Sequence, residues 1–138
     1  MELLLDTMAF IWWASEPERL PEPVRAACAD AGNRLVVSVA SIWEIQTKME
    51  VDRVKMRPTL PLSDDAALDE IIADQQADGV QFSPIELRHV RGMVALPWHH
   101  KDPFDRIILA TALVDEFILI SSDGLLEMYV QDGIRLLW

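Results

Sequence analysis

The sequence has a single cysteine, no long apolar run and few basic residues, and each shortage excludes a class of protein. Cys28 cannot form an internal disulfide, and its apolar helical surroundings favour a buried structural thiol. No apolar run approaches the roughly 20 residues that a membrane-spanning helix requires. The N-terminus from Met1 to Asp6 carries acids where a signal peptide has Lys or Arg. We therefore expect a cytoplasmic protein that does not bind membranes.

Positive charge is scarce, with 12 basic against 23 acidic residues and a net charge of −11. Such a chain lacks the broad basic surface of a protein that holds nucleic acid by electrostatics alone. Eight of the basic residues nevertheless fall in two clusters, one of Lys48, Arg53, Lys55 and Arg57 and the other of Arg88, Arg91, Lys101 and Arg106. Nucleic-acid binding would therefore need a further source of positive charge.

Short apolar runs alternate with helical patterns along the chain, and together they indicate the fold class. We expect strands at residues 2–6, 35–39, 80–82, 117–120 and 134–138. We expect the main helices at about residues 7–13, 24–31, 41–49, 63–77, 84–95 and 103–112. Right-handed crossovers place such helices on both faces of a parallel sheet. The sequence thus predicts one α/β domain over residues 1–138, a three-layer α/β/α sandwich with a four- or five-stranded, mainly parallel sheet.

Several helix starts carry capping signals. The sharpest is Asp102 before Pro103, since an acid can cap the first turn and proline suits the first helical position. Asp105 then lies in that first turn. Thr7 is another expected cap. Ser41 with Glu44 and Ser83 with Glu86 have the spacing of capping boxes, and in the second of these Pro84 occupies the first helical position.

Four acids fall at comparable places near strand ends and helix starts, namely Asp6, Glu44, Asp105 and Asp123. In a doubly wound sheet these places share one edge, where such folds place their chemistry. Crowded carboxylates repel and are costly to bury unless a cation neutralises them. A hard divalent cation such as Mg²⁺ would suit them, and it could bind a phosphodiester and activate a water for hydrolysis. Each acid alone could equally be a helix cap, a capping-box partner or a turn residue.

These residues lie in four motifs that follow one another along nearly the whole chain. The motifs are Leu3–Thr7 with Trp12 and Trp13, Ser38–Ile45 with Lys48, His100–Arg106, and Leu119–Asp123. As a set they resemble the PIN-domain ribonucleases and, within them, the VapC toxins of bacterial toxin–antitoxin pairs. The resemblance implies an endoribonuclease that hydrolyses RNA phosphodiester bonds with Mg²⁺ or Mn²⁺. It further implies a homodimer held inactive by a small cognate antitoxin protein.

The resemblance also assigns site residues by position. The catalytic and metal-binding acids would be Asp6, Glu44, Asp105 and Asp123. Secondary candidates in the same motifs are Thr7, Asp102 and Ser121, and candidate RNA contacts are Lys48, Lys101 and Arg106. The chain departs from the usual pattern at three positions: Met8 replaces a common His, Asp52 a frequent Gly, and Ser122 a frequent basic residue.

Two other functions fit a crevice of strand-end acids. A Mg²⁺-binding phosphoacceptor receiver needs paired acids after its first strand and a lysine after its last, whereas Asp6 stands alone and Ser121–Asp123 carries no lysine. A non-catalytic PIN-like binding module would have no need of four crowded acids. The adjacent His99 and His100 are not expected to form a transition-metal site, because neighbouring histidines face apart and no cysteine joins them.

Overall fold

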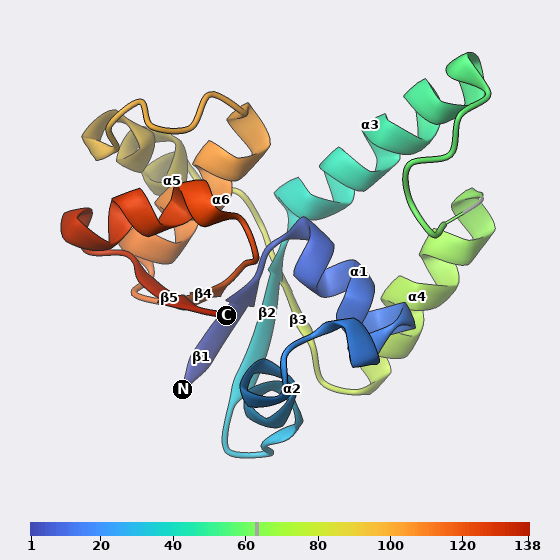
Figure 1. Ribbon diagram of the computed structural model, residues 1–138, viewed down its shortest axis with the longest axis horizontal. Helices are drawn as coiled ribbons and strands as arrows, with labels where there is room; N and C mark the ends of the chain where they lie inside the picture. The colour runs from blue at the N-terminus through green and yellow to red at the C-terminus, as the bar shows by residue number, and fades with distance from the viewer. Residues whose placement is uncertain (63) are drawn as a thin grey trace.

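A computed structural model describes residues 1–62 and 64–138, and its centre is a parallel β-sheet (Figure 1). In this part of the chain five strands pair in the order β3-β2-β1-β4-β5. Their bounds are β1 (Glu2–Leu5), β2 (Arg34–Ser38), β3 (Gln81–Ser83), β4 (Ile118–Ile120) and β5 (Arg135–Leu137). Every pairing is parallel, as expected for strands joined by helical crossovers. The predicted parallel α/β sheet is confirmed.

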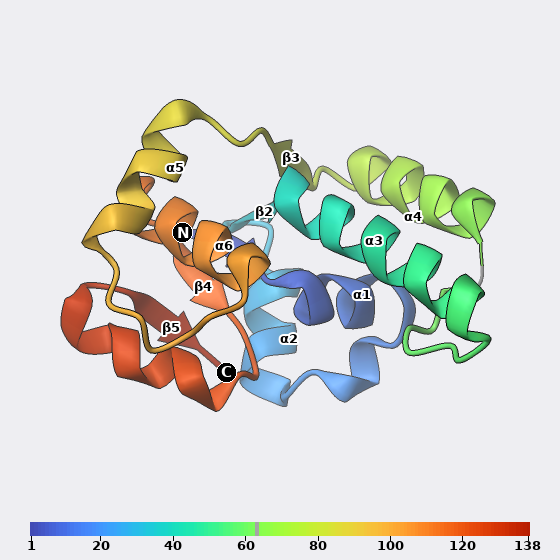
Figure 2. The ribbon, with the colours of Figure 1, turned by 90° about the horizontal axis from the view of Figure 1, so that it is seen from above.

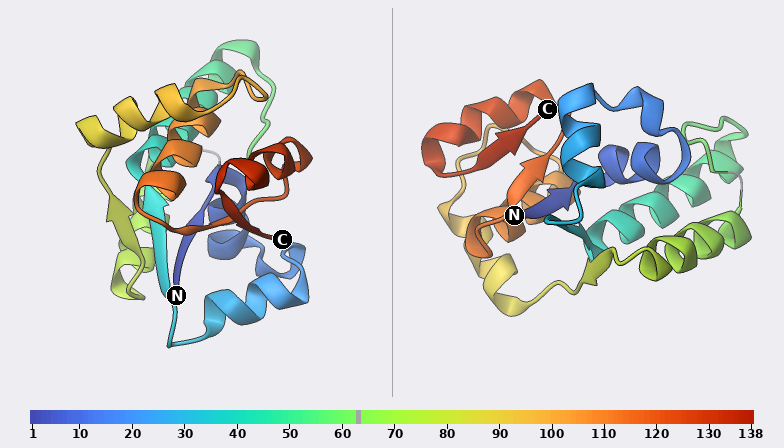
Figure 3. Two further views of the ribbon diagram at one scale, coloured as in Figure 1. Left: turned by 90° about the vertical axis from the view of Figure 1, so that its left-hand side faces the viewer. Right: turned by 90° about the horizontal axis from the view of Figure 1, so that it is seen from below.

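Helices cover both faces of this sheet. The α-helices are α1 (Thr7–Ser15), α2 (Glu22–Ala29), α3 (Val39–Lys55), α4 (Asp65–Ala77), α5 (Leu87–Gly92) and α6 (Pro103–Val114). Short 3₁₀ segments are η1 (Pro17–Arg19), η2 (Met93–Ala95) and η3 (Gly124–Asp132). Figures 1 and 2 show α1, α2 and α4 on one side of the sheet and α5, α6 and η3 on the other, as do the two further views in Figure 3. Among the described helices, none combines the length and apolarity needed to cross a bilayer.

Two apolar cores follow from the alternation of side chains along β1. Leu3 and Leu5 belong to the core under α1 and α2, whereas Leu4 belongs to the core under α6 and η3. All three side chains are fully buried. A central strand buried on both faces explains why β1 is a continuous apolar run.

The sheet has a topological switch point between β1 and β4. These neighbouring strands lead into α1 and η3, which pack on opposite faces. The strand ends stay close, because the Asp6 amide donates to the Ile120 carbonyl at 3.0 Å. Ligands of open α/β sheets bind in the crevice that forms at such a point.

Two helices are capped by an earlier residue than the sequence predicts. The expected helix start at Ser41 is wrong, because Ser38 ends β2 and its side chain accepts the Ala40 amide at 3.1 Å. Ser41 therefore lies inside the first turn of α3. Thr7 is likewise not the cap of α1, since Asp6 occupies that position and accepts the Ala9 amide. In both cases the residue at the strand end also caps the following helix.

The helix expected at 84–95 is shorter and begins later. Ser83 pairs with Ser38 as the last residue of β3, and it caps no helix because residues 84–86, which follow it, are not helical. Glu86 is the N-cap instead, and its amide donates to Nδ1 of His89 at 3.0 Å. The start of the helix predicted at 63–77 lies outside the described residues, and the described part is capped by Asp64.

Candidate active site

The carboxyl ends of β1 and β4 are joined by hydrogen bonds through Asp6. Its Oδ1 accepts the Ala9 amide at 2.8 Å, and its Oδ2 accepts the hydroxyl of Ser121. The Ser121 oxygen in turn accepts the amide of Asp123 at 3.1 Å. Ser121 therefore connects two of the predicted acids, and the Asp6 side chain is held in one orientation in a nearly buried position.

Glu44 reaches the same place from the second turn of α3. Its Oε1 accepts the hydroxyl of Thr7, and its Oε2 lies 2.8 Å from the Lys48 ammonium one turn later. The Ser41 oxygen lies 3.2 Å from that of Thr7. Glu44 is only 3% exposed, so these partners are what make its burial tolerable.

The start of α6 supplies the remaining acid. Asp102 caps the helix as predicted, with its Oδ1 accepting the amides of Phe104 at 2.8 Å and Asp105 at 3.4 Å. Asp105 follows in the first turn, and its Oδ2 lies 3.2 Å from Nε2 of His100. The same nitrogen is 2.9 Å from Oδ2 of Asp123.

All four predicted acids line one cavity of about 160 Å³ at this sheet edge. Its lining consists of Asp6, Thr7, Met8, Glu44, Lys48, Asp102, Asp105, Ser122 and Asp123. Most of these groups are acidic. The cavity is small and polar, which suits an ion and the edge of a larger ligand rather than an enclosed organic molecule.

The ionisation of these carboxyls shows how strongly they are crowded. Burial raises the pKa of Asp6 to about 6, against the opposing hydrogen bonds from Ser121 and Ala9. Burial, followed by the charges of Asp102 and Glu44, raises the pKa of Asp105 to about 7. Burial lowers the pKa of Lys48, but its bond to Glu44 and the nearby acids outweigh this, and the net change is upward. The nearby cationic group does not fully compensate the acids.

The donor set fits a hard divalent cation. Carboxylate oxygens are the ligands that Mg²⁺ and Mn²⁺ prefer, and a bound cation would offset both the burial of these carboxylates and their mutual repulsion. Four such carboxylates, those of the predicted acids, line this one cavity. The residues present are therefore chemically compatible with a metal site.

A family model of the PIN domain matches residues 3–128 of the chain. The chain belongs to the PIN domain family. A curated relative, Ribonuclease VapC22 of Mycobacterium tuberculosis, is 30% identical over 129 residues, which are 92% of this chain and 91% of that protein.

Solved structures show the same fold. This PIN domain matches a chain of the promoter-DNA-bound VapBC2 complex of Rickettsia felis with a TM-score of 0.67 and 11% identity, covering 99% of this chain and 98% of that one. It matches a chain of DNA-bound VapBC of Salmonella typhimurium with a TM-score of 0.66 and 14% identity, covering 99% and 97%.

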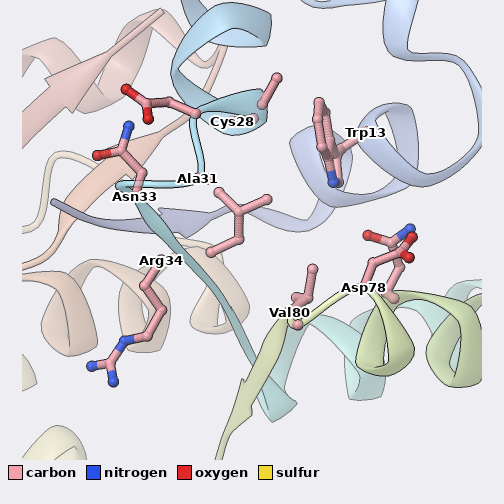
Figure 4. A pocket seen from close by; sticks show the side chains of 12 residues that line it. Trp13, Cys28, Ala31, Asn33, Arg34, Asp78 and Val80 are labelled. Carbon is pink, nitrogen blue, oxygen red and sulfur yellow. The ribbon is translucent and has the colours of Figure 1, made fainter.

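A larger cavity of this PIN domain lies at the opposite edge of the sheet (Figure 4). It measures about 620 Å³ and is lined by residues near the amino ends of β2 and β3, among them Arg34 and Val80. Cys28 borders it, and burial raises the pKa of this thiol to about 11, which makes the thiol a poor nucleophile. Asp30 in the same lining is used in a turn, where it accepts the Gly32 amide at 2.8 Å. Size alone therefore does not identify the functional site.

Arg106 is placed differently from the sequence expectation that it contacts RNA. The residue is 5% exposed, and its guanidinium lies 3.9 Å from the centre of the Trp98 ring. It donates to backbone carbonyls over 2.9–3.3 Å, namely those of Met93, Leu96, Pro97 and His100. Its donors are thus engaged in holding the segment before α6, and a contact of Arg106 with RNA stays a prediction. Lys101, in the same segment before α6, is exposed, and Lys48 is half-exposed beside Glu44.

His100 is the site residue that the sequence interpretation missed. Two signals were available: it stands two residues before a helix cap, and it lies in the same motif as Asp105. The neighbouring His99 turns away and packs edge-on against Tyr129, with ring centres 5.1 Å apart. The expectation that the two histidines face apart is confirmed, but one of them faces the acids.

Proposed function

We propose that this PIN domain is a metal-dependent endoribonuclease and the toxin of a toxin–antitoxin pair. The observation that carries the proposal is the convergence of four carboxylates in one small cavity at the switch point of the sheet. The relative named Ribonuclease VapC22 supports the reaction class, and the VapBC complexes of the same fold support the pairing with an antitoxin.

Mg²⁺ or Mn²⁺ is the proposed cofactor, held by Asp6, Glu44, Asp105 and Asp123. When bound, such an ion supplies a polarised water and a positive charge toward the scissile phosphate. Ser121 and Thr7 orient Asp6 and Glu44 through their hydroxyl groups. Asp102 has a different proposed role, because its carboxylate is used to cap the helix that presents Asp105.

The chain's own cations have distinct proposed roles toward RNA. Lys48 forms an ion pair with the Glu44 carboxylate, and the negative charges of Asp102 and Asp105 also stabilise its ammonium group. Lys101 is exposed and directly precedes Asp102, which lines the cavity, and it can contact a phosphate flanking the cleaved bond. Because the net charge is −11, we expect binding of RNA to depend on the metal as well as on these side chains.

For the antitoxin, we propose a small protein that places a cationic side chain against the four acids. Without a metal these carboxylates form a negative cluster, and a guanidinium can bind two carboxylate oxygens at once. A homodimer in the cytoplasm, with residues 1–138 as one domain, completes the proposal. A complex whose contacts avoid Asp6, Glu44, Asp105 and Asp123 would contradict the proposed mode of inhibition.

The decisive experiment is cleavage of single-stranded RNA by purified protein with Mg²⁺ or Mn²⁺ and with EDTA. Cleavage should require the added ion and should be abolished in Asp105→Asn. The matched control is Asp69→Asn, which removes the same charge from an exposed position on α4. Undiminished cleavage in EDTA, or full activity of Asp105→Asn, would refute the proposal.

A further inference from the structure

His100 stands between two of the acids and uses both ring nitrogens. Its Nε2 lies 2.9 Å from Oδ2 of Asp123 and 3.2 Å from Oδ2 of Asp105. Its Nδ1 lies 3.1 Å from the backbone nitrogen of Asp102, whose amide proton points at it. The side chain is only 12% exposed, so water does not readily replace these contacts.

The bond from Asp102 decides which nitrogen carries the proton. A backbone amide can only donate, so Nδ1 must present its lone pair. The neutral ring then has its proton on Nε2, which is the atom facing the two carboxylates. A doubly protonated ring would set one N–H group against another at Nδ1. The contacts to Asp105 and Asp123 are therefore hydrogen bonds donated by a neutral imidazole.

The same assignment rules out the ring as a metal ligand in this arrangement. His100, Asp105 and Asp123 are close enough to share an ion. A histidine coordinates through an unprotonated nitrogen, however, and the unprotonated Nδ1 is already occupied by the Asp102 amide.

We propose that His100 is a positioning residue whose single N–H group holds Asp105 and Asp123 at a fixed separation. The two acids come from α6 and from the segment after β4, so the ring bridges distant parts of the chain. This inference rests on the proposed metal-dependent function and adds the residue that prepares two acids for the ion. Partners that orient metal ligands in this way typically contribute 10- to 100-fold to metal affinity.

The surrounding structure holds the ring in place. The His100 amide donates to the hydroxyl of Tyr129 at 2.8 Å, and its carbonyl accepts from Arg106 at 3.3 Å. Tyr129 is fully buried, and its own hydroxyl donates to the Pro97 carbonyl at 2.8 Å. Asp123 is fixed from its other side, where Oδ1 accepts the Leu125 amide at 2.9 Å. Both ends of the bridge are thus attached to ordered backbone.

The first test measures the tautomer directly, by NMR of protein with ¹⁵N-labelled histidine. The metal-free protein should show His100 neutral and protonated at Nε2, and saturation with Mg²⁺ should leave that proton in place. A proton on Nδ1, or loss of the Nε2 proton on adding Mg²⁺, would overturn the proposal. This measurement does not depend on any RNA cleavage.

The second test compares two substitutions by calorimetric titration of Mn²⁺. His100→Gln keeps an N–H donor at about the reach of Nε2, whereas His100→Asn is too short to reach both acids. We expect His100→Asn to weaken Mn²⁺ binding by roughly tenfold or more and His100→Gln to recover most of it. His99→Gln is the matched control and should bind Mn²⁺ as wild type does. Melting temperatures in EDTA check that each variant is folded.

The outcomes separate this inference from the proposed function. Unchanged or tighter Mn²⁺ binding by His100→Asn would refute the positioning role even if wild-type protein cleaves RNA. Conversely, Mn²⁺ binding with the expected order of variants would support the role of His100 even if no RNA were cleaved. Absence of any Mn²⁺ binding by wild type would overturn both.

Discussion

Replacing Asp105 by asparagine should stabilise the metal-free protein while abolishing its activity. The side chain lies in the first turn of α6 among other acids, and burial and the charges of Asp102 and Glu44 raise its pKa to about 7. At pH 8 the folded protein must therefore hold an ionised carboxylate in an unfavourable place. Asparagine keeps the shape and still offers an oxygen to the N–H of His100, but carries no charge.

The size of the effect follows from the pKa. A rise from the ordinary value of 3.8 to about 7 corresponds to about 4 kcal/mol, at about 1.4 kcal/mol per pKa unit. The Asp105 side chain is a quarter exposed. Because solvent screens its charge, we expect the substitution to raise the free energy of unfolding by about 2 kcal/mol. For a chain of this length that amounts to a gain in melting temperature of roughly 5 to 8 °C.

The gain should depend on pH with a definite sign. Between pH 3.8 and about pH 7 the folded state keeps a proton on Asp105 that the unfolded state has lost. The free energy of unfolding of the wild type therefore decreases as pH rises through that window. The Asp105→Asn variant has no carboxyl there, so it does not show this decrease. At pH 5.5, safely above the isoelectric point of about 4.5, the gain should be about half of that at pH 8.

The assay is thermal unfolding followed by circular dichroism in EDTA at both pH values, for wild type, Asp105→Asn and the exposed control Asp69→Asn. The control should melt within about 1 °C of wild type, because surface substitutions change stability little. Saturating Mn²⁺ should raise the melting temperature of wild type and not that of Asp105→Asn. A metal-free Asp105→Asn that melts at or below wild type at pH 8 would refute the reasoning.

Three further predictions concern the elements that surround the site. Asp102→Ala should lose about 1 kcal/mol of stability, because the first turn of α6 loses its cap, whereas Asp102→Asn should stay close to wild type and retain much of the cleavage. Arg106→Lys should lose about 2 kcal/mol or more in urea unfolding, since an ammonium cannot satisfy four carbonyls that the guanidinium binds. Gly92→Ala should lose about 1 to 2 kcal/mol, because its Cβ would lie 2.6 Å from a methyl group of Val114.

Each of these has a clear contrary outcome. An inactive Asp102→Asn beside an active Asp105→Asn would reverse the assignment of the two acids. An Arg106→Lys protein with unchanged stability but weaker RNA binding would support the original expectation that this residue contacts RNA. A Gly92→Ala protein as stable as wild type would show that α5 and α6 can separate slightly without cost.

The order and type of most helices and strands could be predicted from the amino-acid pattern. Continuous apolar runs such as Leu3–Leu5 and Ile118–Ile120 identified strands buried on both faces, and the helical repeats between them implied a parallel sheet. Those strand positions also implied that Asp6 and Asp123 share one edge. These inferences succeed because side-chain period and strand direction are local properties of the chain.

Helix boundaries were harder to predict from the sequence, because residues that fit a capping box lie at or just after the end of a strand. Ser41 with Glu44 has the spacing of a capping box, yet α3 begins directly after β2 and is capped by Ser38. Ser83 with Glu86 has the same spacing, yet α5 begins only after Glu86. Ser38 and Ser83 pair with each other at the ends of their strands, and only the path of the chain beyond each strand sets where the next helix begins, which a local pattern does not contain.

Tertiary structure alone decided which way the site's side chains point. Five of the seven residues from His100 to Arg106 are charged or polar, but the structure turns Arg106 inward to carbonyls and His100 toward two acids. Those partners lie up to 23 residues away along the chain. A side chain's direction depends on the groups that distant segments bring to it, so the sequence could identify the acids but not the ring between them.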